Sequence, residues 1–203
     1  MQKNPLTQQQ RAKLFNNPYL EALTKTHPLI PITLFTGFSV GIFGYGYHAN
    51  QFSLFMGIGL LLVGLFLFSL VEYLAHRFLY HMQAKRAWAQ KIVYTFHTVH
   101  HEYPRDEVRL AMPPWLSVLL AAGFYGLFRL LFGAWGFAIT PGFLIGYAAY
   151  LLIHWLVHAY QPPKNRLRFL WLYHNGHHFK DETTAFGVSS PLWDYVFGTL
   201  PKR

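Results

Sequence analysis

Four long runs of apolar residues constrain this chain more than any other feature. They occupy residues 29–47, 52–75, 115–132 and 141–158, and each is close to the roughly 20 residues that a helix needs to cross a bilayer. Only 12% of the 203 residues are charged, against about a quarter in a typical soluble domain. We therefore predict an all-α integral membrane protein with four transmembrane helices, arranged as two helical hairpins.

Proline and glycine residues add detail to these helices. Pro114 and Pro141 are expected in the first turns of the third and fourth helices, where the missing N–H of proline costs nothing. Gly37 and Gly41 form a G-x-x-x-G pair, a weak signal for close approach between helices.

The N-terminal region is polar by comparison. We expect residues 1–28 to form a cytoplasmic or interfacial segment and residues 29–203 to form the membrane domain. The first 28 residues lack the short apolar core of a secretory signal peptide, so we expect the internal runs to direct insertion. A short helix lying at the membrane interface is expected within residues 7–24.

Lys and Arg residues are concentrated before the first run, between the second and third runs, and after the fourth. Four crossings would bring these three segments to one face, which would then carry 16 of the 17 Lys and Arg residues, all except Arg129. The positive-inside rule assigns that face to the cytoplasm. The net charge of +9 then indicates contact with anionic lipid rather than nucleic acid, because no basic patch is interleaved with base-stacking aromatic residues.

Ten of the 12 histidines fall into four clusters, all on the predicted cytoplasmic face. The clusters are H-x4-H at His76 and His81, H-x-x-H-H at His97, His100 and His101, H-x3-H at His154 and His158, and a second H-x-x-H-H at His174, His177 and His178. Imidazole is a suitable ligand for iron, zinc, copper and nickel. Ten ligands divide into five for each of two metal ions, so we predict a histidine-rich dimetal site in a cytoplasmic helical cap.

The spacing makes this prediction more specific. Residues three and four apart share a face of an α-helix, so we expect each H-x-x-H-H to direct its three imidazoles to one point. H-x4-H differs, because residues five apart on a regular helix diverge by about 140°. Either the helix ends or bulges there, or His76 and His81 bind different metal ions, and the second option suits a dinuclear site.

Several other kinds of site are excluded or disfavoured. The chain has no cysteine, which excludes disulfides, thiolate ligands and a cysteine nucleophile. A carboxylate-bridged di-iron bundle is excluded because there are only eight acidic residues and no E-x-x-H motif. Histidine clusters can also form a pH-sensitive surface, but four clusters on one face favour metal binding. The isolated His27 and His48 are interpreted as non-ligands.

The order of the histidine motifs resembles that of the fatty acid hydroxylase/sterol desaturase superfamily of membrane di-iron enzymes. The flanking sequences "VEYLAHRFLYH", "FHTVHHEYPRDEVRLAMPP" and "YHNGHHFKDETTAFGVSSPLWDYVFGT" resemble the fatty acid 2-hydroxylase branch more than the sterol or carotenoid branches. This similarity runs from about Val71 to the C-terminus. Two features depart from that branch: no N-terminal cytochrome b5 domain is expected, and Leu151 follows Tyr150 where the branch tends to have aspartate.

The resemblance implies an O2-dependent oxidoreductase, a fatty acid (2-)hydroxylase that acts on a long acyl chain at C2. All ten clustered histidines would be metal ligands and catalytic residues for two Fe ions, although zinc could occupy the same ligands in purified protein. Electrons would come from a separate donor such as cytochrome b5 or ferredoxin, because no flavin or nicotinamide motif is present. The expected partners are a lipid or fatty acyl substrate, this donor and the bilayer, with no nucleic acid. We expect a multi-pass protein of the bacterial inner membrane rather than the endoplasmic reticulum.

Two alternatives stay open beside this prediction. One is a carotenoid or sterol hydroxylase or desaturase of the same superfamily, since hydroxylation and desaturation both begin with removal of a hydrogen. The other is a non-catalytic zinc-binding membrane protein. Transporters place ionisable groups near the bilayer midplane, whereas these histidines lie at the ends of the runs, which argues against transport.

Charged residues near the clusters are candidates for supporting roles. Four carboxylates are candidates to accept the second N–H of a metal-binding imidazole: Glu72, Asp181, Glu182 and Asp194. Simple solvation is the preferred interpretation for Asp181 and Glu182. Three cations are candidates to bind an anionic headgroup, with positive-inside charge as the competing interpretation: Arg105, Arg109 and Lys180.

Overall fold

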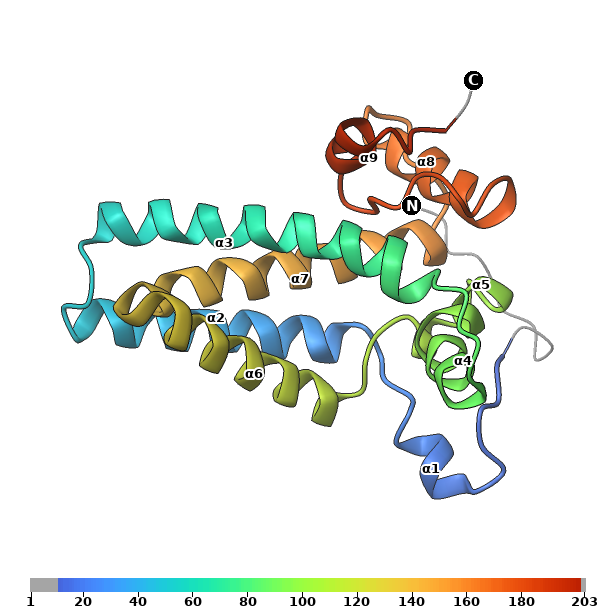
Figure 1. The fold of residues 1–203 in the computed structure, drawn as a ribbon, viewed down its shortest axis with the longest axis horizontal. Coiled ribbons are helices and arrows are strands. Elements are labelled where there is room, and N and C mark those ends of the chain that lie inside the picture. The colour runs from blue at the N-terminus through green and yellow to red at the C-terminus, as the bar shows by residue number, and fades with distance from the viewer. Residues whose placement is uncertain (1–10, 202–203) are drawn as a thin grey trace.

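The computed structural model describes residues 11–201, and its regular structure is helical. Four long helices lie side by side, and shorter helices gather at one end of this bundle (Figure 1). The long helices are α2 (Leu29–His48), α3 (Leu54–Leu74), α6 (Pro114–Phe132) and α7 (Gly136–Ala159). Each overlaps one of the four predicted runs, because a stretch that is apolar on all sides is stable as a helix in lipid.

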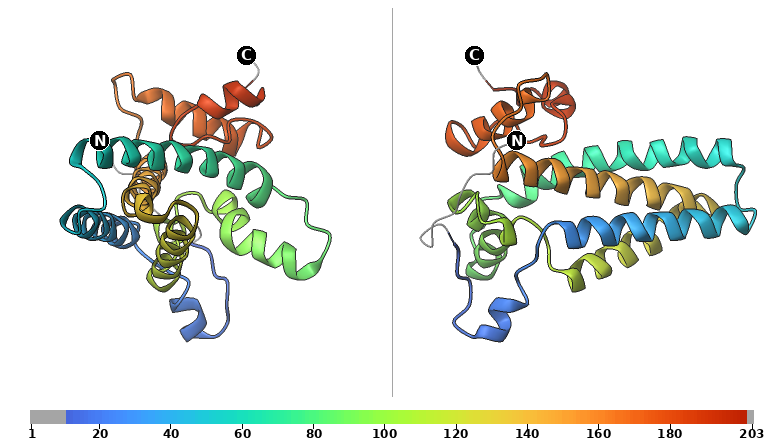
Figure 2. Two further views of the ribbon diagram at one scale, coloured as in Figure 1. Left: turned by 60° about the vertical axis from the view of Figure 1, so that its left-hand side comes forward. Right: turned by 180° about the vertical axis from the view of Figure 1, so that it is seen from behind.

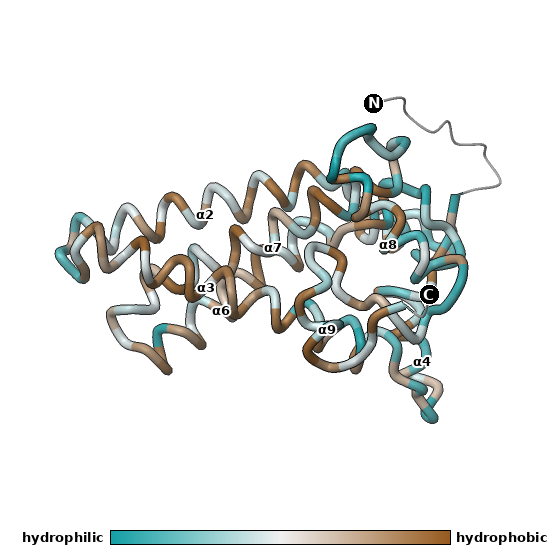
Figure 3. Tube along the Cα trace, turned by 90° about the horizontal axis from the view of Figure 1, so that it is seen from above, coloured by the Kyte–Doolittle hydropathy of each residue, from teal (hydrophilic) through white to brown (hydrophobic). Residues whose placement is uncertain are grey.

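Three continuous segments of the described chain are long and apolar enough to cross a membrane. They are Leu29–His48, Leu54–Tyr80 and Glu107–Ala159. The third contains both α6 and α7, which are joined by the short 3-10 helix η5 (Gly133–Trp135). Figure 3 shows the hydrophobic residues along the long helices and the hydrophilic residues mainly around the other end of the molecule.

The short elements form the end of the molecule where the hydrophilic residues gather. They are α1 (Pro18–Ala22), the π-helix η2 (Ala75–Tyr80), α4 (Ala87–Val93), the π-helix η3 (Tyr94–Thr98), α5 (Val99–Glu102), the 3-10 helix η4 (Glu107–Arg109), α8 (Arg168–Phe179) and α9 (Leu192–Phe197). Of the interfacial helix expected within residues 7–24, the structure has only α1, and residues 7–10 lie outside the described range.

Helix α7 is central to the bundle, and it begins earlier than the sequence indicates. It packs against α2, α3 and α6, and its first nine residues, 136–144, are all buried. The prediction that Pro141 lies in the first turn is wrong, because the helix begins at Gly136. Proline inside a helix is locally unfavourable, so the dense packing around α7 overrides the local preference.

Glycine allows α3 and α7 to touch through their backbones. A Cβ on Gly64 would lie 2.1 Å from the Ile139 carbonyl oxygen, and one on Gly142 would lie 2.0 Å from the Leu61 carbonyl oxygen. The G-x-x-x-G pair formed by Gly37 and Gly41 makes no such contact, since a Cβ added at either position would have nothing within 4 Å among the described residues. The close contact therefore joins the two helices whose ends carry histidine clusters, and it fixes how these ends lie relative to each other.

Candidate metal centre

The structure gathers all ten clustered histidines into two groups of five at one end of the bundle. The first group is His76, His81, His97, His101 and His177, and the second is His100, His154, His158, His174 and His178. Within each group, one nitrogen from every ring lies within 4.8 Å of the others. The two isolated histidines, His27 and His48, belong to neither group, as expected.

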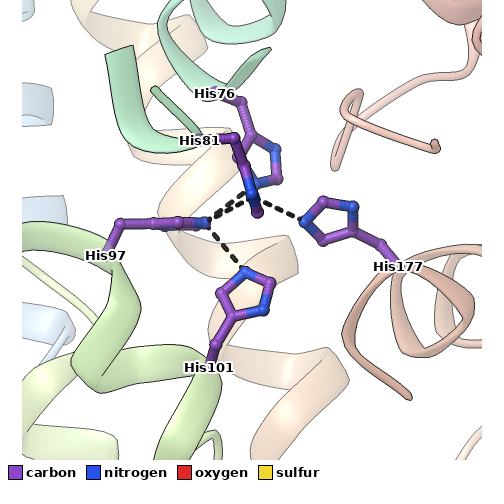
Figure 4. Close-up of side chains that lie close together, drawn as sticks. All are labelled: His76, His81, His97, His101 and His177. Carbon is purple, nitrogen blue, oxygen red and sulfur yellow. Dashed lines mark hydrogen bonds between the residues drawn. The ribbon is translucent and has the colours of Figure 1, made fainter. Parts of the chain in front are cut away.

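In the first group the Nε2 atoms converge from three parts of the chain (Figure 4). The Nε2 atom of His97 lies 3.1 Å from that of His76, 3.0 Å from that of His81 and 2.9 Å from that of His101. The Nε2 atom of His177 lies 3.0 Å from that of His81. A neutral imidazole nitrogen carries either one proton or one lone pair, so hydrogen bonding among the rings cannot satisfy all these contacts.

A π-helix explains how His76 and His81 reach the same group. Helix α3 continues into η2, where the His81 N–H donates to the His76 carbonyl oxygen over 3.2 Å. This i to i+5 hydrogen bond widens the turn and brings together two residues that a regular helix would separate. Of the two options offered by H-x4-H, the bulged helix is therefore correct, and the assignment of the two histidines to different groups is wrong.

Each H-x-x-H-H motif divides its histidines between the groups, so the expectation that all three point to one place is wrong. His97 and His101 join the first group and His100 the second, whereas His174 and His178 join the second group and His177 the first. Around a helix, the third histidine of the motif, four residues after the first, lies about 40° to one side of the first. The second histidine, three residues after the first, lies about 60° to the other side. Each motif therefore lies between the two groups and contributes to both.

The second group is more deeply buried and has fewer internal contacts between nitrogens. The Nε2 atom of His174 lies 2.9 Å from that of His158 and 3.0 Å from that of His178. Within the described part of the chain, both ring nitrogens of His100 and His154 are buried without a hydrogen-bond partner. Buried polar atoms are nearly always satisfied, so these orphaned nitrogens indicate a ligand that completes them.

Both groups fit a transition-metal ion. Ligands at right angles around an ion, at the Zn–N distance of about 2.1 Å, lie about 3.0 Å apart, which matches the observed spacings of 2.9–3.1 Å. Metal binding also needs neutral imidazoles. Burial, reinforced by neighbouring imidazoles, lowers the pKa of His100 and of His174 well below the usual range. The rings therefore present lone pairs, not positive charges, at neutral pH.

Backbone carbonyl groups orient two rings of the first group. The Nδ1–H of His76 donates to the Phe186 carbonyl oxygen over 2.5 Å, and the Nδ1–H of His177 donates to the Thr184 carbonyl oxygen over 2.7 Å. Each bond leaves the Nε2 lone pair directed into the group. The sequence offers no signal for these partners, because any residue has a carbonyl oxygen.

Two of the predicted carboxylates bond to the loop beside the histidines rather than to the histidines themselves. Asp194 accepts hydrogen bonds from the Phe186 and Gly187 N–H groups, at 2.9 and 2.8 Å. Glu72 accepts from the N–H and hydroxyl of Ser189, at 2.8 and 2.5 Å. Both residues therefore hold the loop that supplies the carbonyl groups, and the expectation that they accept an imidazole N–H directly is wrong. Asp181 and Glu182 are exposed, as the preferred interpretation has it.

Among the three candidate headgroup cations, Arg109 is wrongly assigned. It is 8% exposed and forms a buried ion pair with Glu21, and it also bonds to Thr24. Arg109 thereby fastens Glu21 of α1 and the nearby Thr24 to η4. The other two candidates, Arg105 and Lys180, are exposed.

An apolar cavity of about 450 Å³ reaches both groups, within the range of about 300–1,000 Å³ usual for ligand sites. At one end it is lined by histidines of the first group (His76 and His97) and of the second (His100 and His154). It extends between the long helices, where Leu116, Leu120, Phe124 and Phe143 line it. A long apolar molecule placed there would bring one end to both groups.

Comparison with known proteins agrees with this arrangement. The family model described as "Fatty acid hydroxylase" matches residues 61–199. The dihydroceramide fatty acyl 2-hydroxylase FAH2 of Arabidopsis thaliana is 40% identical over 149 residues, which cover 72% of this chain and 63% of that protein. The ceramide very long chain fatty acid hydroxylase scs7 of Schizosaccharomyces pombe is 36% identical over 196 residues, covering 93% of this chain and 54% of that protein.

A solved structure is similar as well. The structure titled full-length scs7p, in which only the hydroxylase domain is visible, superposes with a TM-score of 0.84 at 35% identity. The match covers 93% of this chain and 72% of that one. The chain spans less than two thirds of the length of the two curated relatives. The family match covers well over half of the sequence, and the chain belongs to the fatty acid hydroxylase family.

Proposed function

We propose that this protein hydroxylates a long acyl chain at C2, using O2 and two electrons from a separate donor. One observation carries the proposal: a single apolar cavity reaches both five-histidine groups and continues between the long helices. Family membership supports it, as do relatives whose names include fatty acyl 2-hydroxylase and ceramide very long chain fatty acid hydroxylase.

The ten histidines would hold two iron ions, five to each, and zinc suits the same nitrogen donors. Bound iron supplies the reduction of O2 and the removal of hydrogen from an unactivated C–H bond. The protein contributes the geometry around that chemistry. Buried rings stay neutral, the carbonyl groups of Phe186 and Thr184 fix two of them, and the loop held by Asp194 keeps those carbonyl groups in place.

The shape of the cavity favours oxidation near the polar end of the substrate. The histidines lie where the apolar helices end, so the carboxyl end of an acyl chain would lie beside them. The remaining methylene groups would extend between α3, α6 and α7, against side chains such as Leu120 and Phe143. The first carbons of the chain would then lie nearest the histidines, and C2 is the position we assign.

The electrons would come from a separate protein such as cytochrome b5 or ferredoxin.

We also propose that the chain divides into an N-terminal segment, residues 1–28, and a membrane domain, residues 29–203. The bonds from Arg109 to Glu21 and Thr24 support a segment that contacts the membrane domain.

We further propose that α2, α3, α6 and α7 each cross the bilayer, with both histidine groups on the cytoplasmic face. The concentration of Lys and Arg on that side supports this orientation, and a bacterial inner membrane stays the expected location.

The orientation is tested by labelling single cysteines, which report topology directly because the chain has no cysteine of its own. An impermeant maleimide should label Lys85→Cys only from the cytoplasmic side and Asn50→Cys only from the opposite side, and the reverse pattern would refute the orientation.

The function is tested by mass spectrometry of hydrolysed lipids from cells that express the protein. The intact protein should produce 2-hydroxy fatty acids, and His177→Ala should reduce them to the background of cells without the protein. His48→Ala is the matched control, because His48 is exposed at the opposite end of α2, and it should retain the product. Hydroxylation at another carbon, or on a carotenoid or sterol ring, would refute the substrate; unchanged product from His177→Ala would refute the site.

A further inference from the structure

We propose that α4 and its neighbours form a membrane-contacting surface, the α4 face, which lies among the headgroups of the cytoplasmic leaflet and admits lipid into the cavity. The α4 face comprises Phe78, Leu79, Trp88, Ile92 and Phe96. The contact with lipid follows from exposure, charge and position alone, whereas the entry of substrate rests on the proposed function.

The α4 face is apolar but uncovered. The exposed fractions of Trp88, Ile92 and Phe96 are 62%, 45% and 43%. These residues are spaced by four, so they form one stripe along α4 and η3. Ala89 and His97, on the same segment, are buried. A large aromatic stripe of this kind in water is unfavourable and marks a contact with another apolar phase.

The charged residues near the stripe indicate that the apolar phase is lipid. The sequence from residue 73 to residue 101 contains no Asp or Glu, but it contains Arg77, Lys85, Arg86 and Lys91. Exposed aromatic and aliphatic residues flanked by Lys and Arg are typical of segments that lie in the interface of an anionic leaflet. A positive surface fits anionic headgroups better than it fits a second copy of the same basic chain, which has a net charge of +9.

The position of α4 agrees with such a contact. Figures 1 and 2 show α4 beside the end of the bundle, turned across the direction of the long helices. Phe78 and Leu79, which are 60% and 51% exposed, lie in η2, the direct continuation of the apolar helix α3. The surface is therefore continuous with a segment that is long and apolar enough to cross the membrane.

The α4 face also leads to the cavity. Leu79 and Phe96 are each about half exposed and line the cavity, as do His76 and His97 of the first metal group. The same two side chains thus touch the outside of the protein and the space beside the histidines. A lipid in the leaflet could pass its acyl chain between them without leaving an apolar environment.

The experiment uses nitroxide labels on single cysteines, which the cysteine-free sequence allows. Trp88→Cys and Ile92→Cys are labelled in the full chain, reconstituted in bilayers of phosphatidylcholine and phosphatidylglycerol. Gln90→Cys is the matched control, because Gln90 is exposed on the same helix but points about 200° away from Trp88. Accessibility to oxygen, which concentrates in lipid, is compared with accessibility to a nickel chelate, which stays in water.

Labels at positions 88 and 92 should favour oxygen, and the label at position 90 should favour nickel. Equal nickel accessibility at all three positions would show that the face meets water, and exclusion of both reagents would show that protein covers it. Either outcome overturns the proposal. These labels report on lipid contact without any turnover, so they remain decisive even if the proposed reaction is wrong.

The entry of substrate is tested separately with the double variant Trp88→Asp/Ile92→Asp. Its activity on bilayer-borne substrate, relative to its activity in detergent micelles, should fall about tenfold against the intact protein, which corresponds to about 1.4 kcal/mol of lost lipid contact. Metal content serves as the measure of intact folding. An unchanged ratio with unchanged metal content would overturn the entry route.

Discussion

A histidine that binds metal must be neutral and directed, and burial helps to keep it neutral; seven of the ten histidines in the two groups are buried and three are partly buried. Burial first, and then nearby imidazoles, lower the pKa of His101 to about 3. Burial likewise lowers the pKa of His177 to about 4, although its bond to the Thr184 carbonyl opposes the shift. Bonds to the Phe186 and Thr184 carbonyl groups direct the rings of His76 and His177, so the Nε2 atoms of these two neutral rings can coordinate a metal without first losing a proton.

The choice of residues, but not their sorting, could be predicted from the sequence. Twelve histidines, no cysteine and few carboxylates leave imidazole as the only ligand type for the ten clustered positions. The division within each H-x-x-H-H depends on the direction in which its helix faces, as His97 and His100 illustrate. That direction is set by tertiary packing, which spacing alone does not contain.

A prediction at this scale concerns the buried pair of Glu21 and Arg109. Burial alone would raise the pKa of Glu21, but bonds from Lys25, Phe15, Arg109 and Leu14 lower it to about 2, against an ordinary value of 4.5. The carboxylate therefore stabilises the fold fully above about pH 4.5, and this contribution is lost as the pH falls toward 2. Glu21→Gln should cost about 3–5 kcal/mol at pH 7, because it leaves Arg109 buried without its partner.

The measurement is the midpoint of thermal unfolding for the intact protein and for Glu21→Gln across this pH range. The difference should be constant from pH 7 to about 5 and should shrink below 4.5. Lys25→Gln is the control, since the Lys25 side chain is 41% exposed and surface pairs contribute about 0–1 kcal/mol. No difference at pH 7, or one that grows on acidification, would contradict the role of the pair.

At the scale of elements, the apolar runs are sufficient to predict the long helices to within a few residues at most ends. They fail at the start of α7, where burial on all sides keeps Gly136–Thr140 helical despite Pro141. The apolar runs alone do not predict η2; the H-x4-H spacing of His76 and His81 offers a bulged helix only as one of two options. Within η2, the ring of His76 is bonded to the Phe186 carbonyl oxygen, a long-range contact that the local sequence does not contain.

The contact between α3 and α7 gives a prediction for these elements. Gly142→Ala would place a Cβ 2.0 Å from the Leu61 carbonyl oxygen, so the helices must separate at a cost of about 1–3 kcal/mol. Because α3 leads to His76 and α7 carries His154, metal content should fall together with the unfolding temperature. Gly59→Ala is the control, since nothing among the described residues lies within 4 Å of that Cβ position, and equal behaviour of the two variants would contradict the proposed coupling.

At the scale of the whole molecule, the fold separates two tasks. The long helices supply an apolar cavity, and the short elements at one end bring together histidines from segments up to about 100 residues apart, such as His76 and His177. Length and hydropathy indicate the first task from the sequence alone. For the assembly of the histidines, the sequence predicts only which motifs take part. It does not predict how they meet, because long-range contacts between α8 and η2 leave no local pattern.

The most direct test of the paired sites is the number of metal ions per chain, measured by elemental mass spectrometry on protein loaded with iron. We expect two ions in the intact protein and in His48→Ala. One ion should remain in His177→Ala, which loses a ligand of the first group, and one in His178→Ala, which loses a ligand of the second. The double variant should bind none. A single ion in the intact protein, or two ions in either single variant, would contradict two separate five-histidine sites.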